Sequence, residues 1–126
     1  MFFYSINPPN AAITELKKII NILLIEPLLE KLKKTSNRVV LYGSCALGTD
    51  TSESDLDLFV VSNRNKEASN IISNFKFPRG YENIDIQSVI KTPVELLKAG
   101  ESEHAFMEEV ERGIVLWEKV AHEPRI

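Results

Sequence analysis

Residues 39–62, VVLYGSCALGTDTSESDLDLFVVS, decide the fold of this chain. Two apolar runs within it, 39–42 and 56–61, are each short enough to predict a buried strand. A small-residue turn, Gly43-Ser44, separates them, followed by a stretch that can form one helical turn and by a polar loop. The pattern predicts two core strands with the polar residues concentrated in their connection.

The second of these strands opens with two carboxylates, Asp55 and Asp57. Side chains alternate along a strand, so both acids share one face while Leu56 takes the other. Repulsion and desolvation would push a proton onto one of two buried acids unless a cation lies between them. Because Mg²⁺ prefers oxygen ligands, the pair predicts a divalent metal site.

The turn before the carboxylates predicts the second half of a site. Gly43 has no Cβ, so its backbone can approach a ligand closely. The amides of Ser44 and the residues after it would point outward at the start of a helical turn, where phosphate binds well. A phosphate cradle beside a metal-binding carboxylate pair indicates a site for a nucleoside triphosphate.

These motifs resemble a known family. Gly43-Ser44, ten residues, then Asp55-x-Asp57 is similar to the signature of the nucleotidyltransferase superfamily that includes DNA polymerase beta. The extended form, GSCALG followed by SDLDL, is most similar to the minimal nucleotidyltransferases, small prokaryotic proteins of which many are antitoxins of HEPN-type ribonuclease toxins. A helix ending in Glu-Arg-Gly before an apolar run adds to the likeness, which covers roughly residues 12–119.

The resemblance implies a set of roles. Asp55, Asp57 and Asp85 would be the catalytic and metal-binding residues, holding one or two Mg²⁺ ions, and Gly43 and Ser44 would bind the nucleotide. Asp85 matches the family's third carboxylate and lies between isoleucines in a predicted strand, 84–90. The implied reaction moves a nucleoside monophosphate, AMP from ATP, onto a hydroxyl of a partner protein, a HEPN-type toxin.

Cys45 stands where many relatives have arginine, and we interpret it as a small packing residue. The substitution leaves open whether this chain keeps full activity. Three functions therefore stay open: an antitoxin enzyme that modifies its toxin, a non-catalytic antitoxin that occludes it, and a small-molecule (antibiotic) nucleotidyltransferase. The third is disfavoured because about 40 residues follow Asp85, too few for an acceptor domain.

Composition limits the class of protein. The 126 residues predict one domain spanning 1–126, with 1–10 as a flexible arm. A net charge of −3 with no basic face argues against dedicated nucleic-acid binding. One cysteine forms no internal disulfide. From the composition of the opening residues and the shortness of the apolar runs, we expect neither a signal peptide nor a membrane span. We expect a cytoplasmic protein that does not enter membranes.

The first predicted helix runs from about residue 11 to 34, and Pro27 is expected to kink or split it between residues 23 and 26. Its predicted core stripe is Ile13, Leu16, Ile20, Leu24, Leu28 and Leu32. Further apolar residues spread beyond that stripe: Ile19, Ile22, Leu23 and Ile25. A helix apolar on two sides must bury both, so a homodimer through this helix is predicted, with burial of the same surface by the partner protein as the alternative.

The rest of the chain predicts further alternating elements. Asn63 is expected to cap a helix at 64–75, and Thr92 to start a short helix, with a capping box, that Gly100 ends. A helix at 102–112 and a small edge strand or extended tail at 114–117 follow. The fold class is α+β: a polymerase-beta-like nucleotidyltransferase fold, a mixed sheet with helices packed mainly on one side.

Overall fold

The computed structural model describes residues 11–50, 55–100 and 103–119, so the predicted arm at 1–10 lies outside the described residues. The apolar runs of the central stretch form strands as expected. The elements in chain order are α1 (Ala11–Leu32), β1 (Arg38–Tyr42), α2 (Ser44–Leu47), β2 (Leu56–Val61), α3 (Asn65–Asn74), β3 (Ile86–Lys91), α4 (Pro93–Leu97), α5 (His104–Glu111) and β4 (Ile114–Glu118).

The four strands form one mixed sheet in the order β3-β2-β1-β4. β1 is antiparallel to both β2 and β4, whereas β2 and β3 are parallel. β1 and β2 are therefore the central strands, which explains why their sequences are almost continuously apolar. Antiparallel pairing sets Tyr42 opposite Asp57, so the end of β1 meets the beginning of β2.

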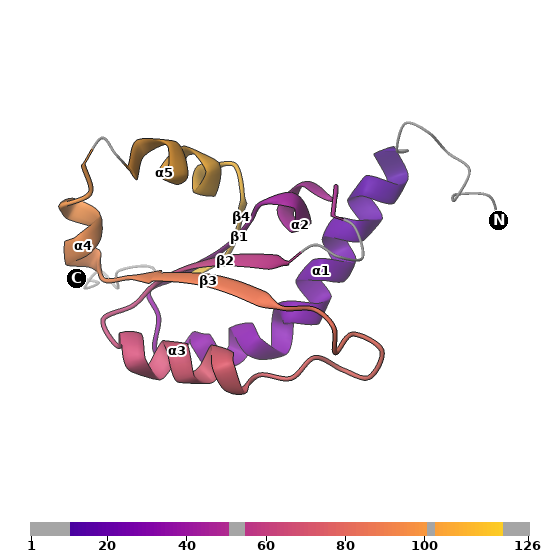
Figure 1. Cartoon of the computed structure of the whole chain (residues 1–126), viewed down its shortest axis with the longest axis horizontal. Helices are drawn as coiled ribbons and strands as arrows, with labels where there is room; N and C mark the ends of the chain where they lie inside the picture. Colours follow the sequence, from indigo (N-terminus) through magenta and orange to yellow (C-terminus); the bar gives the residue numbers. More distant parts are fainter. Residues whose placement is uncertain (1–10, 51–54, 101–102, 120–126) are drawn as a thin grey trace, which may run out of the picture.

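Helices cover both faces of the sheet, with the longer ones on one face (Figure 1). α1 and α3 pack their apolar residues, such as Leu28 and Ile72, against Leu56 and Leu58 of β2. The shorter α4 and α5 lie across the opposite face, where Val110 joins Phe59 in a second core cluster. The predicted mixed α+β fold is confirmed, and its smaller helical layer covers the face that carries Asp57.

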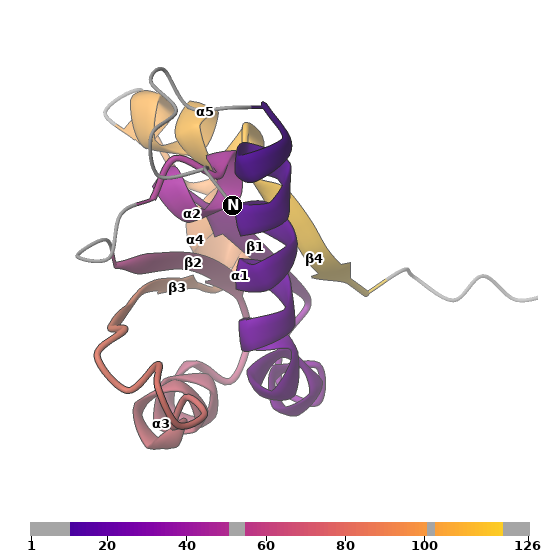
Figure 2. The same ribbon diagram turned by 90° about the vertical axis from the view of Figure 1, so that its right-hand side faces the viewer.

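α1 is a continuous helix that bends. Pro27 lies inside α1, and Figure 2 shows the first turns of the helix from the side and its last turns nearly end-on, in agreement with the predicted kink.

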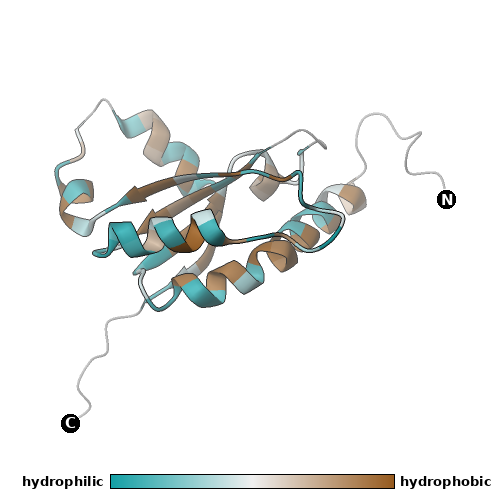
Figure 3. Ribbon diagram, turned by 60° about the horizontal axis from the view of Figure 1, so that its bottom comes forward, coloured by the Kyte–Doolittle hydropathy of each residue, from teal (hydrophilic) through white to brown (hydrophobic). Residues whose placement is uncertain are grey.

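The predicted core stripe of α1 is only half right, because Leu28 and Leu32 are buried whereas Leu16 and Ile20 are exposed. Burial follows the C-terminal half of α1, which is the half in contact with the sheet. Apolar residues continue along the helix beyond that half (Figure 3).

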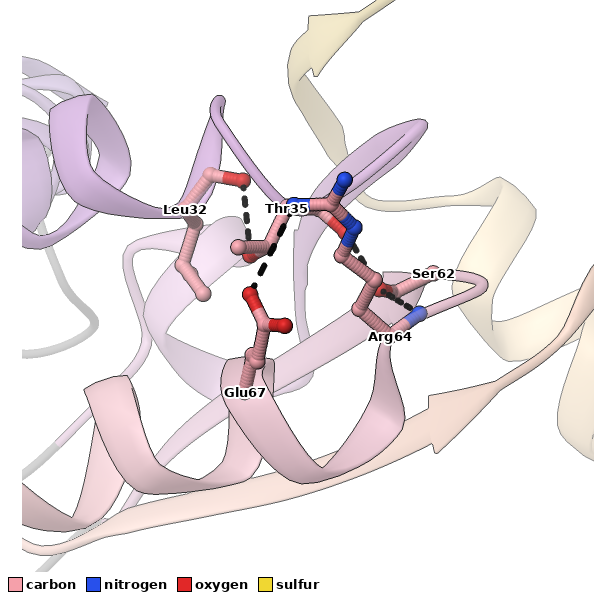
Figure 4. A network of polar contacts seen from close by, with 5 residues as sticks. All are labelled: Leu32, Thr35, Ser62, Arg64 and Glu67. Atoms are coloured by element: carbon pink, nitrogen blue, oxygen red, sulfur yellow. Dashed lines mark hydrogen bonds and ion pairs between the residues drawn. The ribbon is translucent and has the colours of Figure 1, made fainter.

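At the end of β2 a buried hydroxyl organises the start of α3 (Figure 4). Ser62 donates to the carbonyl of Thr35, and its Oγ accepts from the amide of Arg64 at 2.9 Å. The expected cap at Asn63 is wrong: Arg64 occupies the N-cap position, without a side-chain cap, and Ser62 holds its amide. Asn63 does not cap the helix, because the buried Ser62 side chain already accepts from the Arg64 amide.

The C-terminal elements follow the sequence signals closely. The Thr92–Glu95 capping box is present, with Glu95 N–H donating to Thr92 Oγ1 at 3.1 Å and the reciprocal bond at 2.9 Å. α4 ends at Leu97, earlier than the predicted stop at Gly100. The 114–117 run is a paired strand, β4, rather than a tail. Across the described ranges, none of the helices has the length and apolar character needed to cross a bilayer.

Candidate active site

The predicted site lies where β1 ends and β2 begins. Gly43, one residue after Tyr42, has φ 74° and ψ −159°, a conformation that side-chain-bearing residues rarely adopt. A Cβ at this position would lie 2.3 Å from Oδ2 of Asp57. Glycine is therefore required twice, for the turn and for the Asp57 carboxylate that lies directly against it.

The electrostatics of Asp57 are those of a carboxylate placed near other acids. Burial raises the pKa of the Asp57 carboxyl, and the charges of Asp55 and Glu109 raise it further. Asp57 is half-buried and Asp55, at the mouth of β2, is exposed. The structure thus brings the two predicted carboxylates close enough to interact, and their repulsion is the cost that we expected from the sequence.

These two acids fit a magnesium ion. They supply hard oxygen donors, and a bound cation would relieve the repulsion that raises the Asp57 pKa. Mg²⁺ in nucleotide sites is commonly held by one or two carboxylates together with substrate phosphates and water. In the described ranges no group of three or more His, Cys, Asp or Glu side chains is close enough to hold a metal ion.

Asp85 lies at the same end of the sheet but is not gathered with the other two acids. It precedes β3 rather than lying inside a strand, and its carbonyl accepts the amide of Leu56 at 2.9 Å. The pairing of Leu56 with Ile86 sets Asp85 level with Asp55. Its side chain is exposed, and β3, which follows it, is an edge strand of the sheet. A role for Asp85 as third ligand stays a prediction.

Ser44 follows Gly43 directly and begins α2. The amides of Ala46 and Leu47 donate to the Gly43 carbonyl at 3.1 and 3.2 Å, which closes the turn. Gly48 ends α2 in the left-handed conformation, and a Cβ there would lie 2.2 Å from the Thr14 carbonyl of α1. The predicted helical turn is therefore present and its position is fixed by close backbone contact with α1.

A buried amide also ties α1 to this turn. Asn21 Nδ2 donates to the Cys45 carbonyl and to Oδ1 of Asp50, both at 3.1 Å. The Cys45 thiol is buried, and burial together with the charges of Asp50, Asp57 and Asp55 raises its pKa to about 12. A thiol with this pKa is protonated at neutral pH, so the interpretation of Cys45 as a packing residue is supported.

Sequence reasoning missed the contribution of α5 to this site. Phe106 packs edge-to-face on Tyr42 and Phe59, at centroid distances of 5.6 and 5.8 Å, which sets α5 over the face that carries Asp57. Burial, then the charges of Asp57 and Glu109, raise the pKa of Tyr42. Glu109 thus lies near both residues. The apolar spacing of Phe106 and Val110 was the available signal, because it fixes which face of α5 meets the sheet.

The comparison with protein families decides the classification. The sequence model of the nucleotidyltransferase domain family matches residues 22–120, most of the chain. The chain belongs to the nucleotidyltransferase domain family. The resemblance to minimal nucleotidyltransferases, first drawn from GSCALG and SDLDL, is thereby confirmed. A search of curated proteins found no match.

A solved structure supports the fold of this nucleotidyltransferase. A protein from Sulfolobus solfataricus, described as a candidate nucleotidyltransferase, superposes with a TM-score of 0.52 at 16% sequence identity. The alignment covers 90% of this chain and 94% of that chain. At this identity the likeness bears on the fold alone.

Proposed function

We propose that this nucleotidyltransferase moves a nucleoside monophosphate from ATP onto a hydroxyl of a partner protein. The observation that carries the proposal is the Asp57 carboxylate, which lies against Gly43 and near Asp55, where β1 ends and β2 begins. Family membership supports nucleotidyl transfer in general. The donor ATP, the metal and the protein acceptor are the parts that we propose.

The reaction forms one bond and breaks one. The acceptor hydroxyl oxygen bonds to the α-phosphorus, the bond between that phosphorus and the α–β bridging oxygen breaks, and pyrophosphate leaves. The hydroxyl proton passes to a carboxylate or to water. Such a displacement requires mainly alignment and neutralisation of charge, which a rigid turn and fixed carboxylates can provide.

Each site residue has a proposed role. Asp55 and Asp57 would hold one or two Mg²⁺ ions, whose chemistry is to neutralise the triphosphate and polarise its phosphorus. Gly43 lets the triphosphate approach the backbone, and Ser44 donates from its amide and hydroxyl. Asp85, level with Asp55 at the sheet edge, would join them when substrate is bound and help to accept the acceptor proton.

The proposed acceptor is a HEPN-type toxin, which makes this chain a cytoplasmic antitoxin. The resemblance to minimal nucleotidyltransferases supports the pairing, and the small size of the domain supports an acceptor that is itself a folded protein. An occluding antitoxin without catalysis is the alternative, favoured by the absence of a basic residue from α2, whose sequence is SCAL.

We also propose that the chain self-associates through α1. Leu16, Ile19 and Leu23 expose 52%, 53% and 62% of their surface and lie along one side of the helix. Ile20, Leu24 and Pro27 continue the patch into a groove closed by Pro78 and Tyr81. An apolar stripe of this kind on a monomer is costly to leave in water, and a second copy of α1 would cover it.

The test is a transfer assay with the co-encoded neighbouring protein. The two proteins are incubated with Mg²⁺ and each of the four ribonucleoside triphosphates in turn, and both are weighed by intact mass spectrometry. The proposal expects the partner to gain the mass of AMP with wild type and not with Asp57→Asn. Toxin neutralisation by Asp57→Asn with no mass change in any sample would favour the occluding antitoxin instead.

A further inference from the structure

A cavity of about 340 Å³ lies beside the proposed metal site, between the Gly43 turn and α5. Its lining residues come from two segments: Gly43, Ala46 and Leu47 on one side, and Ala105, Glu108, Glu109 and Arg112 on the other. Gly43 belongs both to this cavity and to the contact with the Asp57 carboxylate. A group bound against the Gly43 turn therefore faces the end of α5.

The end of α5 is fixed at this place by close packing. Val110 is 1% exposed in the second core cluster, and Phe106 packs on Tyr42. Gly113 follows Arg112, and a Cβ on Gly113 would lie 2.3 Å from the Leu41 carbonyl and 3.0 Å from Cβ of Tyr42. The backbone at Arg112 is thus set next to the last residues of β1, immediately before the Gly43 turn.

Arg112 is the basic residue among those that line this cavity. In the described part of the chain no ion pair includes Arg112, whereas acidic side chains pair with five lysines and arginines: Lys18, Lys33, Arg38, Arg64 and Lys91. Glu108 of this cavity lies 2.8 Å from Nε2 of His104. α2 supplies no basic residue, and Cys45 at its start is uncharged. The α5 side of the cavity is otherwise acidic, through Glu108 and Glu109.

We infer that Arg112 binds the triphosphate of the donor nucleotide in this cavity. The inference rests on the proposed function and deepens it by naming the cation of the phosphate site. A guanidinium presents several N–H donors in a plane and forms paired hydrogen bonds to phosphate oxygens. The charge of Arg112 also offsets the acids of α5, which would otherwise repel a polyanion from the Gly43 turn.

The experiment measures binding without requiring transfer. Isothermal titration calorimetry is run with Mg²⁺–ATP, with Mg²⁺–tripolyphosphate, which lacks a nucleoside, and with adenosine, which lacks phosphate. The variants are Arg112→Gln and Arg112→Lys, and the control is Arg64→Gln at the opposite end of β2, whose side chain is exposed and pairs with Glu67. Arg112 is exposed, so its variants are expected to fold; a thermal melt of each checks this.

We expect Arg112→Gln to bind both phosphate ligands at least about tenfold more weakly, the loss typical of a charge-assisted hydrogen bond. Arg112→Lys should recover part of the affinity, and Arg64→Gln should match wild type. Equal affinity of Arg112→Gln and wild type for both phosphate ligands would overturn the inference while leaving the proposed function intact. If wild type binds neither phosphate ligand, the proposed function fails, and the role of Arg112 fails with it.

Discussion

Replacing Gly43 with alanine tests the geometry of the site through stability alone. The backbone at Gly43, with φ 74° and ψ −159°, is in a region that is almost exclusive to glycine. An alanine held there costs about 1–3 kcal/mol of strain. Its Cβ would also meet Oδ2 of Asp57 at 2.3 Å, so the carboxylate must leave its position. Forcing a side chain off its rotamer costs about 0.5–1.5 kcal/mol more.

The expected loss for Gly43→Ala is therefore about 1.5–4.5 kcal/mol in the free energy of unfolding, the sum of the two costs. In a domain of this size each kcal/mol lowers Tm by about 4 °C. Urea unfolding and thermal melts measure the loss directly. Gly80→Ala is the matched control, because Gly80 also has positive φ (96°) but a Cβ there would meet nothing within 4 Å.

A double-mutant cycle separates strain from clash. In an Asp57→Ala background the carboxylate is absent, and the nearest remaining atom of residue 57 is its Cβ at 3.5 Å, an ordinary contact. Gly43→Ala should then cost only the strain, about 1–3 kcal/mol. If the cost of Gly43→Ala is the same with and without Asp57, the carboxylate does not lie against the turn and the described site is wrong.

Three further predictions concern the charges and surfaces around the site. Asp57→Asn should leave the metal-free protein as stable as wild type or more stable. Because the pKa of Asp57 is raised in the folded protein, wild type loses stability as the pH rises from the ordinary pKa of 3.8 through the raised pKa. Urea unfolding should therefore show a stability advantage of the variant at neutral pH and little advantage below pH 3.8. The pKa of Cys45 is about 12 against an ordinary 9.0, so the fraction present as thiolate at pH 7 should be about a thousandfold lower than for a free cysteine. Rapid alkylation of Cys45 in the folded protein at pH 7 would contradict its burial. Leu23→Glu on the exposed side of α1 should lower the molar mass measured by light scattering from dimer to monomer, and a wild type that stays monomeric at high concentration would refute self-association.

Local signals in the sequence predicted the local structure well. Residues 56–61 form β2 within the predicted bounds because a run this apolar is stable when it is buried in a central strand of a sheet. Thr92 and Glu95 form their capping box because both partners lie within one turn of helix. That Asp55 and Asp57 lie close together was predictable for the same reason, since a single residue separates them in the chain. That they bind a metal stays a prediction.

Features set by distant packing were not predictable. Glu109 and Arg112 lie near Asp57 and the Gly43 turn only because α5 lies across the sheet face that carries Asp57, and the segments that meet are about fifty to seventy residues apart. Asp85 was expected inside a strand, but β3 is an edge strand and begins one residue later. Leu16 and Ile20 have helical core spacing, yet the sheet covers only the second half of α1. In each case the decisive partner is absent from the local sequence.

The central claim is that Asp55, Asp57 and the Gly43 turn bind a metal–triphosphate. The most direct measurement compares the thermal stability of wild type and Asp57→Asn with and without Mg²⁺–ATP. A ligand that binds only the folded state stabilises it by about 2.7 kcal/mol at a hundred times its Kd. Wild type should show this gain, and Asp57→Asn should lose most of it, since a neutral amide is a weaker ligand for the ion. If Asp57→Asn keeps the full gain, the carboxylate pair is not the binding site and the account is wrong.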